Sequence, residues 1–354
     1  NRPRGRRRVC VANTNSLRVK QRRGYTMKKF LSIALALLMV CVMLPVVALA
    51  AEKTASTYEE LKSAISTAND GDTIKLLADI DLSQTITVNK TITLNMNGKK
   101  LYNTSDLWDK PTAEDDNWSL ISVRGSGNLT ITGNGTFAAK ENDCYAVDVQ
   151  ESATVTIKNG TFIGNIHAVY VFAGTANVEG GTYSVQQKYP DSAKGDEFVL
   201  NCYDANRANG TAHINVTGGT FKNFNPADNK AEGEGNNFAD NSLVVQKNNT
   251  VQNNDYYVGN AANEVIAAAS KGEEIFVLNG TTLTNVPAGV IIQNRTGDRI
   301  TVNGKDVELT GDAGYTVPAS NITIIVPGDT TPAETPKTDD QKNPSTGAND
   351  FVGL

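Results

Sequence analysis

One short sequence unit recurs four times in this chain, and it restricts the fold more than any other feature. Each copy alternates apolar and polar residues, turns at Asn-Gly or Gly-Gly, and continues with Thr and an aromatic residue. The turn glycines Gly135, Gly160, Gly181 and Gly219 are 25, 21 and 38 residues apart, so the last interval contains an inserted loop. The copies are Leu129–Phe137, Val155–Phe162, Ala176–Tyr183 and Ile214–Phe221.

Repeats with this period predict a solenoid, here a parallel β-helix. Asn and Gly tolerate positive φ, so the chain can bend sharply between two flat sheets at each turn. Coils stacked about 4.8 Å apart would bring the four aromatic residues into one inward-facing column. An antiparallel sandwich is the alternative, but it does not explain why the same turn recurs at the same place. The expected column is Phe137, Phe162, Tyr183 and Phe221.

A helix is expected before the first coil, at residues 57–69, with Gly71 after it. Its apolar residues share one face, and a solenoid needs its first coil covered, so we expect a capping helix. Strands are expected at 73–77, 85–88 and 91–94, with a turn at Asn97-Gly98. Residues 266–278 match 65–77 at a constant offset of 201, and 299–305 echo 91–99. The chain therefore holds a second, small helix-plus-strand module.

The segment that carries these features resembles a known superfamily. Tyr58-Glu-Glu-Leu61, Gly71-Asp-Thr-Ile-Lys-Leu76 and Thr91-Ile-Thr-Leu-Asn-Met-Asn-Gly98 resemble the right-handed parallel β-helix proteins of the pectate-lyase-like superfamily, over residues 57 to 258. Within that group the chain looks most like adhesin-like surface proteins of gut bacteria, and residues 218–238 resemble a segment that often terminates such helices. The resemblance implies an all-β fold, and its right-handedness also follows the rule for parallel crossovers.

The start of the chain is typical of an exported protein. Residues 27–50 carry two lysines after Met27, an apolar run, and small residues at the end, which predicts a secretory signal peptide. A membrane helix is the alternative, but Pro45 and the small-residue exit disfavour it. Residues 1–26 are basic and precede Met27, and we interpret them as an upstream extension that does not belong to the fold.

The charge of the mature chain argues against a nucleic-acid partner. Residues 1–50 hold eleven of the 33 lysines and arginines and none of the 38 acids, so their removal changes the net charge from −5 to −16. Nucleic acid would be repelled by that charge. An acidic exterior suits solubility outside the cell and cation binding. No cofactor is expected, with bound calcium left open.

The other end of the chain, residues 327–354, has linker composition, rich in Pro, Thr and Asp. In it, Asn343-Pro-Ser-Thr-Gly347 resembles the sortase sorting motif of Gram-positive bacteria, with Asn343 in place of the usual leucine. The resemblance implies cleavage after Thr346, attachment of Thr346 to peptidoglycan, and a hydrophobic segment beyond Leu354. A featureless polar tail is the alternative. The β-helix domain would then span 51–258 and the second module 259–326.

The loop from Tyr102 to Trp118 is the best candidate for a binding site, because it holds both tryptophans and a cluster of acids. Tryptophan faces stack on sugar rings, and acids accept sugar hydroxyls or hold calcium. The alternative is a solvated loop whose tryptophans pack back on the coil. The candidate residues are Trp108, Trp118, Asp106, Asp109, Glu114, Asp115 and Asp116.

No residue pattern points to a catalytic site. A glycosidase needs two close carboxyls, but Asp148 and Glu179 fall in different coils. The arginine base of a lyase needs a calcium site beside it, and the sequence shows none there. The histidines lack a companion ligand at metal-binding spacing. We interpret the remaining candidates, His167, His213, Arg124 and Arg207, as ordinary coil or surface residues.

Cys144 and Cys202 are the two cysteines of the mature chain. An even pair in an exported protein suggests a disulfide, but each lies at nearly the same distance before its turn glycine, with one complete coil between them. Two coil steps correspond to about 9.6 Å, beyond the roughly 7 Å that a disulfide spans. We predict two reduced, inward-facing thiols.

These observations together predict a monomeric, secreted β-helix attached to the wall of a Gram-positive bacterium. The leading hypothesis is a non-catalytic adhesin that binds a glycan or another cell-surface ligand. A polysaccharide lyase or glycoside hydrolase of the same superfamily is the second hypothesis, and a passive surface stalk is the third.

Overall fold

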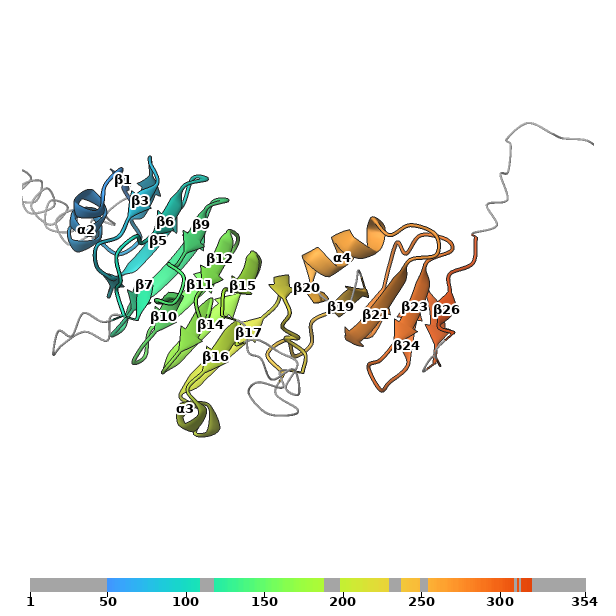
Figure 1. The fold of residues 1–354 in the computed structure, drawn as a ribbon. Coiled ribbons are helices and arrows are strands. Elements are labelled where there is room, and N and C mark those ends of the chain that lie inside the picture. The colour runs from blue at the N-terminus through green and yellow to red at the C-terminus, as the bar shows by residue number, and fades with distance from the viewer. Residues whose placement is uncertain are drawn as a thin grey trace, which may run out of the picture.

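The fold is mostly β, with long parallel sheets stacked around a common core (Figure 1). The computed structural model describes residues 50–108, 118–187, 198–228, 237–248, 254–308, 311 and 313–319. Between β2 and β16, each turn of the chain gives one strand to each of three sheets, here called A, B and C, before the next turn begins. This arrangement is consistent with the predicted β-helix.

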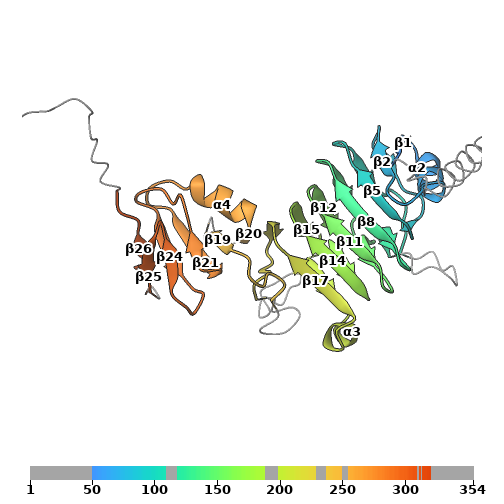
Figure 2. The ribbon, with the colours of Figure 1, turned by 180° about the vertical axis from the view of Figure 1, so that it is seen from behind.

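Sheet A has seven strands, all parallel, and its outer face is seen in Figure 2. Every second side chain is buried in Asn128–Thr132, Thr154–Ile157 and Ala212–Val216, as expected for a sheet with one solvated face. In spatial order the strands are β1 (Glu52–Ala55), β2 (Thr73–Leu76), β5 (Thr91–Asn95), β8 (Asn128–Thr132), β11 (Thr154–Ile157), β14 (Gly174–Val178) and β17 (Ala212–Val216).

Sheets B and C complete each coil. Sheet C is parallel and contains β4 (Ile86–Val88), β7 (Ser119–Val123), β10 (Tyr145–Val149), β13 (Val169–Val171) and β16 (Leu200–Cys202). The part of sheet B that belongs to the coils is also parallel, and its strands are β3 (Ile80–Asp81), β6 (Lys100–Tyr102), β9 (Thr136–Ala138), β12 (Thr161–Gly164), β15 (Thr182–Val185) and β18 (Gly219–Lys222).

The predicted aromatic column is confirmed. Its four residues pair in register across β9, β12, β15 and β18. All four side chains have an exposed fraction of 0%. Successive ring centroids are 4.9, 5.2 and 5.0 Å apart, with planes 14°, 10° and 10° from parallel. The repeated Thr-aromatic positions therefore form the core beneath sheet B.

Glycine is required at the turns for two different reasons. Gly181 has a φ of +99°, which side chains rarely adopt, as the sequence predicts for these turns. Gly135 is an exception, since its φ is not positive. There a Cβ would lie 2.3 Å from Cβ of Met96, so close approach of the neighbouring coil excludes a side chain.

Helix α2 (Tyr58–Ser66) forms at the predicted place but ends three residues before the predicted limit. Thr57 caps it by accepting a hydrogen bond from the backbone N–H of Glu60, 3.2 Å away. The helix buries Leu61 and its neighbouring apolar residues, and it contacts β1 and β2. Strand β1 was not predicted. It precedes α2 and adds a strand to the edge of sheet A.

The second, smaller part of the chain repeats the order helix, then strand. It buries a separate cluster of apolar side chains, and Figure 1 shows it to the right of the stacked coils. The predicted offset aligns α4 with α2 and the start of β21 with β2. Its elements are β19 (Val244–Asn248), β20 (Asn254–Val258), α4 (Asn260–Ala267), β21 (Glu274–Asn279), β22 (Thr282–Leu283), β23 (Ile291–Asn294), β24 (Ile300–Val302), β25 (Lys305–Val307) and β26 (Tyr315–Thr316).

Cys144 and Cys202 are both buried, and neither is in a disulfide, as predicted. Burial raises the pKa of the Cys144 thiol. The predicted equivalence of their positions is wrong, however. Cys202 is in register with Val171 and through it with Val149, whereas Cys144 precedes β10.

Among the described residues, no helix is long and apolar enough to cross a membrane.

Candidate functional site

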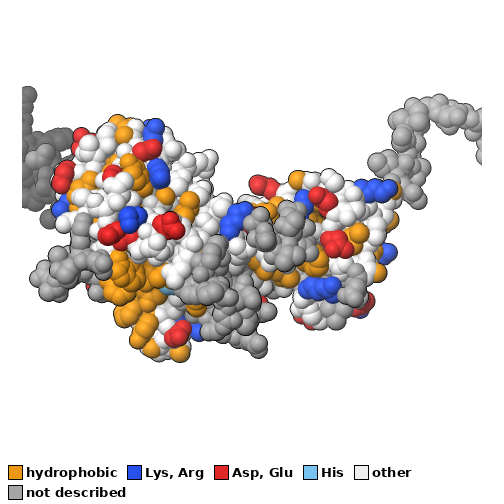
Figure 3. All heavy atoms as spheres, viewed as in Figure 1, with side chains coloured by type: hydrophobic (Ala, Val, Ile, Leu, Met, Phe, Trp, Pro, Cys, Tyr) orange, Lys and Arg blue, Asp and Glu red, His pale blue; other side chains and the backbone are white. Residues whose placement is uncertain are grey.

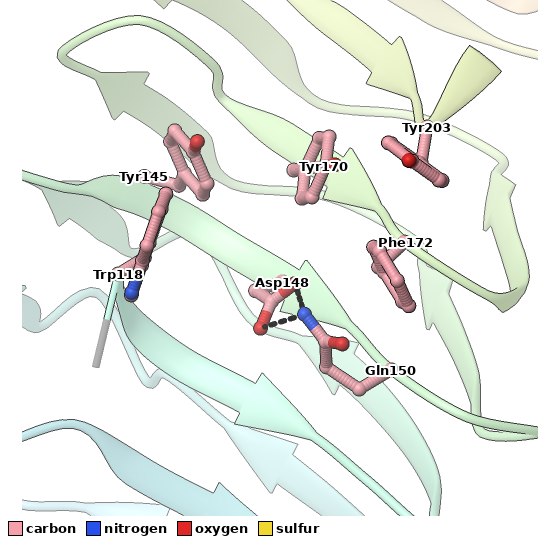
Figure 4. A pocket seen from close by; sticks show the side chains of 7 residues that line it. All are labelled: Trp118, Tyr145, Asp148, Gln150, Tyr170, Phe172 and Tyr203. Carbon is pink, nitrogen blue, oxygen red and sulfur yellow. Dashed lines mark hydrogen bonds between the residues drawn. The ribbon is translucent and has the colours of Figure 1, made fainter. Parts of the chain in front are cut away.

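A groove of about 310 Å³ lies on the outer face of sheet C. Five of the seven described side chains that line it are aromatic, although this face is turned towards solvent. We call it the aromatic groove, and Figure 4 shows it from close by. The lining residues are Trp118, Tyr145, Asp148, Gln150, Tyr170, Phe172 and Tyr203.

The register of sheet C brings these residues together from successive coils. Val149, Val171 and Cys202 are in register and buried. The residues that directly follow them are Gln150, Phe172 and Tyr203. Because side chains alternate between the two faces of a strand, these three lie side by side on the outside. Asp148 and Tyr170 are in register with each other two residues before Gln150 and Phe172, so they lie on the same outer face.

The aromatic rings of the groove contact one another, and three of the five leave much of their surface open. Phe172 stacks on Tyr203 at 4.9 Å and 26°, and Tyr145 lies 5.2 Å from Tyr170. Trp118, Phe172 and Tyr203 are nevertheless 40%, 39% and 44% exposed. Figure 3 shows hydrophobic side chains gathered at the lower left of the larger part of the molecule. Exposed apolar patches of this kind mark binding surfaces.

Asp148 forms the polar floor of the groove. Its carboxylate is only 1% exposed and accepts a hydrogen bond from the hydroxyl of Ser122 at 2.9 Å. The side-chain amide of Gln150 also donates to it, at 2.8 and 3.0 Å to the two oxygens (Figure 4). Ser122 in turn accepts from Nε of Arg124 at 2.9 Å. The buried charge is therefore held by fixed donors, as a buried carboxylate requires.

His167 lies behind the aromatic rings and stacks on Tyr170 at 5.3 Å. Its Nδ1 is 2.7 Å from the carbonyl oxygen of Phe198, so Nδ1–H donates and Nε2 accepts from the amide of Asn201 at 3.2 Å. Burial lowers the pKa of His167 to about 4. Both ring nitrogens are occupied, so His167 supports the groove as a neutral ring.

Asp143 anchors the start of the predicted loop against the coil. Its buried carboxylate accepts hydrogen bonds from the backbone N–H groups of Leu107 and Trp108, each at 3.0 Å, and from the amide of Asn103 at 2.6 Å. The Trp108 ring then lies 4.4 Å from the ring of Trp118. Trp108 therefore buttresses the residue that lines the groove.

Of the residues predicted for the loop site, the structure brings the two tryptophans together. Trp118 lines the groove and Trp108 lies behind it. Asp106 does not line the groove. It forms an ion pair with Lys140 at 2.6 Å. The described residues contain no group of three or more His, Cys, Asp and Glu that could hold a metal. Asp109, Glu114, Asp115, Asp116 and Thr346 lie outside the described residues.

The other polar residues considered from the sequence do not meet at one place. Glu179 lies on the sheet A side and pairs with Lys158 at 3.5 Å, away from Asp148 on sheet C. His213 is exposed, and its Nε2 is 2.8 Å from the carbonyl oxygen of Gly210. Arg207 lies on the short helix α3 (Asp204–Ala208), with Asp204 4.0 Å away.

Sequence reasoning missed most of the groove. Tyr145, Gln150, Tyr170, Phe172 and Tyr203 belong to the third strand of each coil or directly follow it, and that strand has no Gly-Thr-aromatic marker. Alignment of the ends of β10, β13 and β16 would have shown that Gln150, Phe172 and Tyr203 lie side by side. Comparisons with protein families, with curated proteins and with solved structures found no match to this chain.

Proposed function

We propose that this protein is a non-catalytic glycan-binding protein and that the aromatic groove is its binding site. The observation that carries the proposal is the set of half-exposed aromatic rings from successive coils around a polar floor. Aromatic faces stack on the apolar faces of sugar rings, and fixed polar groups orient the hydroxyls. The groove offers both kinds of contact within one face of the sheet.

The composition of the groove favours binding over catalysis. Hydrolysis of a glycosidic bond needs two carboxyl groups at a defined separation. Asp148 is the one acid among the described lining residues, and its oxygens already accept from Ser122 and Gln150. We therefore assign Asp148 a structural role in the site.

The wider role rests on the sequence patterns. We propose that the fold is a right-handed β-helix of the pectate-lyase-like kind, with α2 covering its first coil. Export through residues 27–50 and attachment to peptidoglycan through Thr346 would display the groove on a Gram-positive cell surface as an adhesin. Asp109, Asp115 and Asp116 would be the residues to bind calcium, if the loop binds it.

Glycan binding can be measured through the protein's own fluorescence, because both of its tryptophans are beside the groove. We expect titration with the bound glycan, found by glycan-array screening, to change the emission. Phe172→Ala should abolish the change, since it removes one exposed face of the groove. Leu77→Ala is the matched control, as Leu77 is 48% exposed outside the groove. Equal binding by both variants, or no binding by the unaltered protein, would contradict the proposal.

A further inference from the structure

We infer that the aromatic groove selects uncharged sugar units that donate a hydroxyl hydrogen to Gln150, and that it rejects uronates. This inference rests on the proposed function and specifies the ligand class of the same site. It follows from the way that Asp148 orients the amide of Gln150.

The amide of Gln150 has one donor end and one acceptor end, and Asp148 decides which end faces the ligand. A carboxylate only accepts hydrogen bonds, so the NH₂ group of Gln150 must face Asp148, at 2.8 and 3.0 Å. The carbonyl oxygen of Gln150 is left on the groove side of the amide. A ligand at this position must therefore donate a hydrogen bond, as a hydroxyl does and an ionised carboxylate does not.

The negative charge of Asp148, next to this amide, acts in the same direction. A ligand carboxylate beside Gln150 would face the Gln150 carbonyl oxygen and the negative charge of Asp148. The described lining residues include no lysine or arginine. Arg124 reaches this network from outside the lining, through the Nε–H that it donates to Ser122. A ligand carboxylate at this position would place its acceptor oxygens against the acceptor oxygens of the protein. Specific sites reject unwanted ligands through unfavourable contacts of this kind.

The test uses matched ligands that differ only in the carboxyl group. Hexasaccharides of galacturonate, mannuronate and glucuronate are each compared with the same hexasaccharide after reduction of its carboxyls to hydroxymethyl groups. Binding is followed by tryptophan emission and by calorimetry at pH 7. We expect at least one reduced form to bind at least about ten-fold more tightly than its uronate parent.

Two variants assign this preference to the Asp148–Gln150 pair. Asp148→Asn removes the charge and lets the Gln150 amide turn over, so the ratio between reduced and uronate forms should fall to about three-fold or less. Gln150→Ala should weaken binding of the reduced form about five- to ten-fold. It leaves the aromatic rings in place. Because Gln150 is only partly buried, this variant keeps the test valid if Asp148→Asn fails to fold.

The outcomes separate the inference from the proposed function. Uronate binding that equals or exceeds binding of the reduced forms, and that Phe172→Ala abolishes, would overturn the selectivity but leave glycan binding intact. An unchanged preference in both Asp148→Asn and Gln150→Ala would overturn the role of the pair. Absence of binding by every hexasaccharide and every glycan on the array would overturn both proposals.

Discussion

Aromatic side chains from successive coils are stacked in two places, inside sheet B and outside sheet C. In the aromatic column the rings are fully buried and lie within 14° of parallel. In the aromatic groove the contacts are more tilted, 26° for Phe172 with Tyr203 and 45° for Tyr145 with Tyr170. The column rings have protein on both faces, whereas Trp118, Phe172 and Tyr203 in the groove are about two-fifths exposed. The same coil spacing therefore stabilises the core in one place and offers a binding surface in the other.

A substitution in the aromatic column should cause the largest loss of stability. Phe162 lies in its middle, between Phe137 and Tyr183. Phe162→Ala should lower the free energy of unfolding by about 3–5 kcal/mol, because a buried ring is lost and a cavity remains. Chemical denaturation measures this change in the free energy of unfolding. Tyr183→Phe, which removes only a hydrogen bond to the Gly180 carbonyl, should cost about 1 kcal/mol. Equal, negligible effects would show that the column does not support the fold.

A fall in pH should destabilise the protein through His167, the buried ring that supports the groove. Burial holds the pKa of His167 at about 4, below its ordinary value of 6.5. Between these values the unfolded chain binds a proton that the folded chain does not, so stability is lost as the pH falls from 6.5 towards 4. The contribution is about 3 kcal/mol. The stability–pH profile of His167→Gln should lack this component, and that of His213→Gln should keep it. Parallel profiles for His167→Gln and the unaltered protein would contradict the burial of His167.

The anchor at Asp143 should matter less for stability and more for the groove. Asp143→Asn leaves one oxygen to accept from the donors of Asn103, Leu107 and Trp108, at a cost of about 1–3 kcal/mol. Trp108 should then move away from Trp118, and the tryptophan emission should shift. Asp106→Asn is the control, since its exposed ion pair with Lys140 contributes at most about 1 kcal/mol. If both variants have the same emission, Asp143 does not position the loop.

The groove rings themselves should contribute least to stability. Phe172→Ala removes a ring that is 39% exposed and leaves no enclosed cavity, so it should cost clearly less than Phe162→Ala, about 1 kcal/mol. Its effect should appear in glycan binding instead. A loss of several kcal/mol would mean that the groove rings belong to the core, and the contrast between the two stacks would fail.

The column was predictable because one short marker fixes its register. Each Gly-Thr-aromatic unit places its aromatic residue directly after the turn, so the distance from glycine to ring is constant. The groove lacks this property. Six residues separate β9 from β10, but fourteen separate β15 from β16. Variable connections of this kind conceal which residues of sheet C are neighbours.

The same cause explains the error in the cysteine positions. Cys144 and Cys202 were aligned by counting back from the turn glycines Gly160 and Gly219. That count crosses the connection from sheet C to sheet A, which has four residues between β10 and β11 but nine between β16 and β17. The prediction of two thiols outside a disulfide was nevertheless correct. Strand β1 was missed because it is only four residues long and its partner is β2, more than twenty residues later.

The antiparallel pairing of β20 with β18 has a consequence for self-association. Strand β18 is the last coil strand of sheet B, and an uncovered strand in that position is a template for edge-to-edge aggregation. Here β20 pairs with it from Gly219 to Lys222, and β19 pairs with β20 in turn. A second molecule therefore cannot extend sheet B by adding its own strand to β18. The reversal of strand direction after the last coil protects the protein from growing into fibres at this edge.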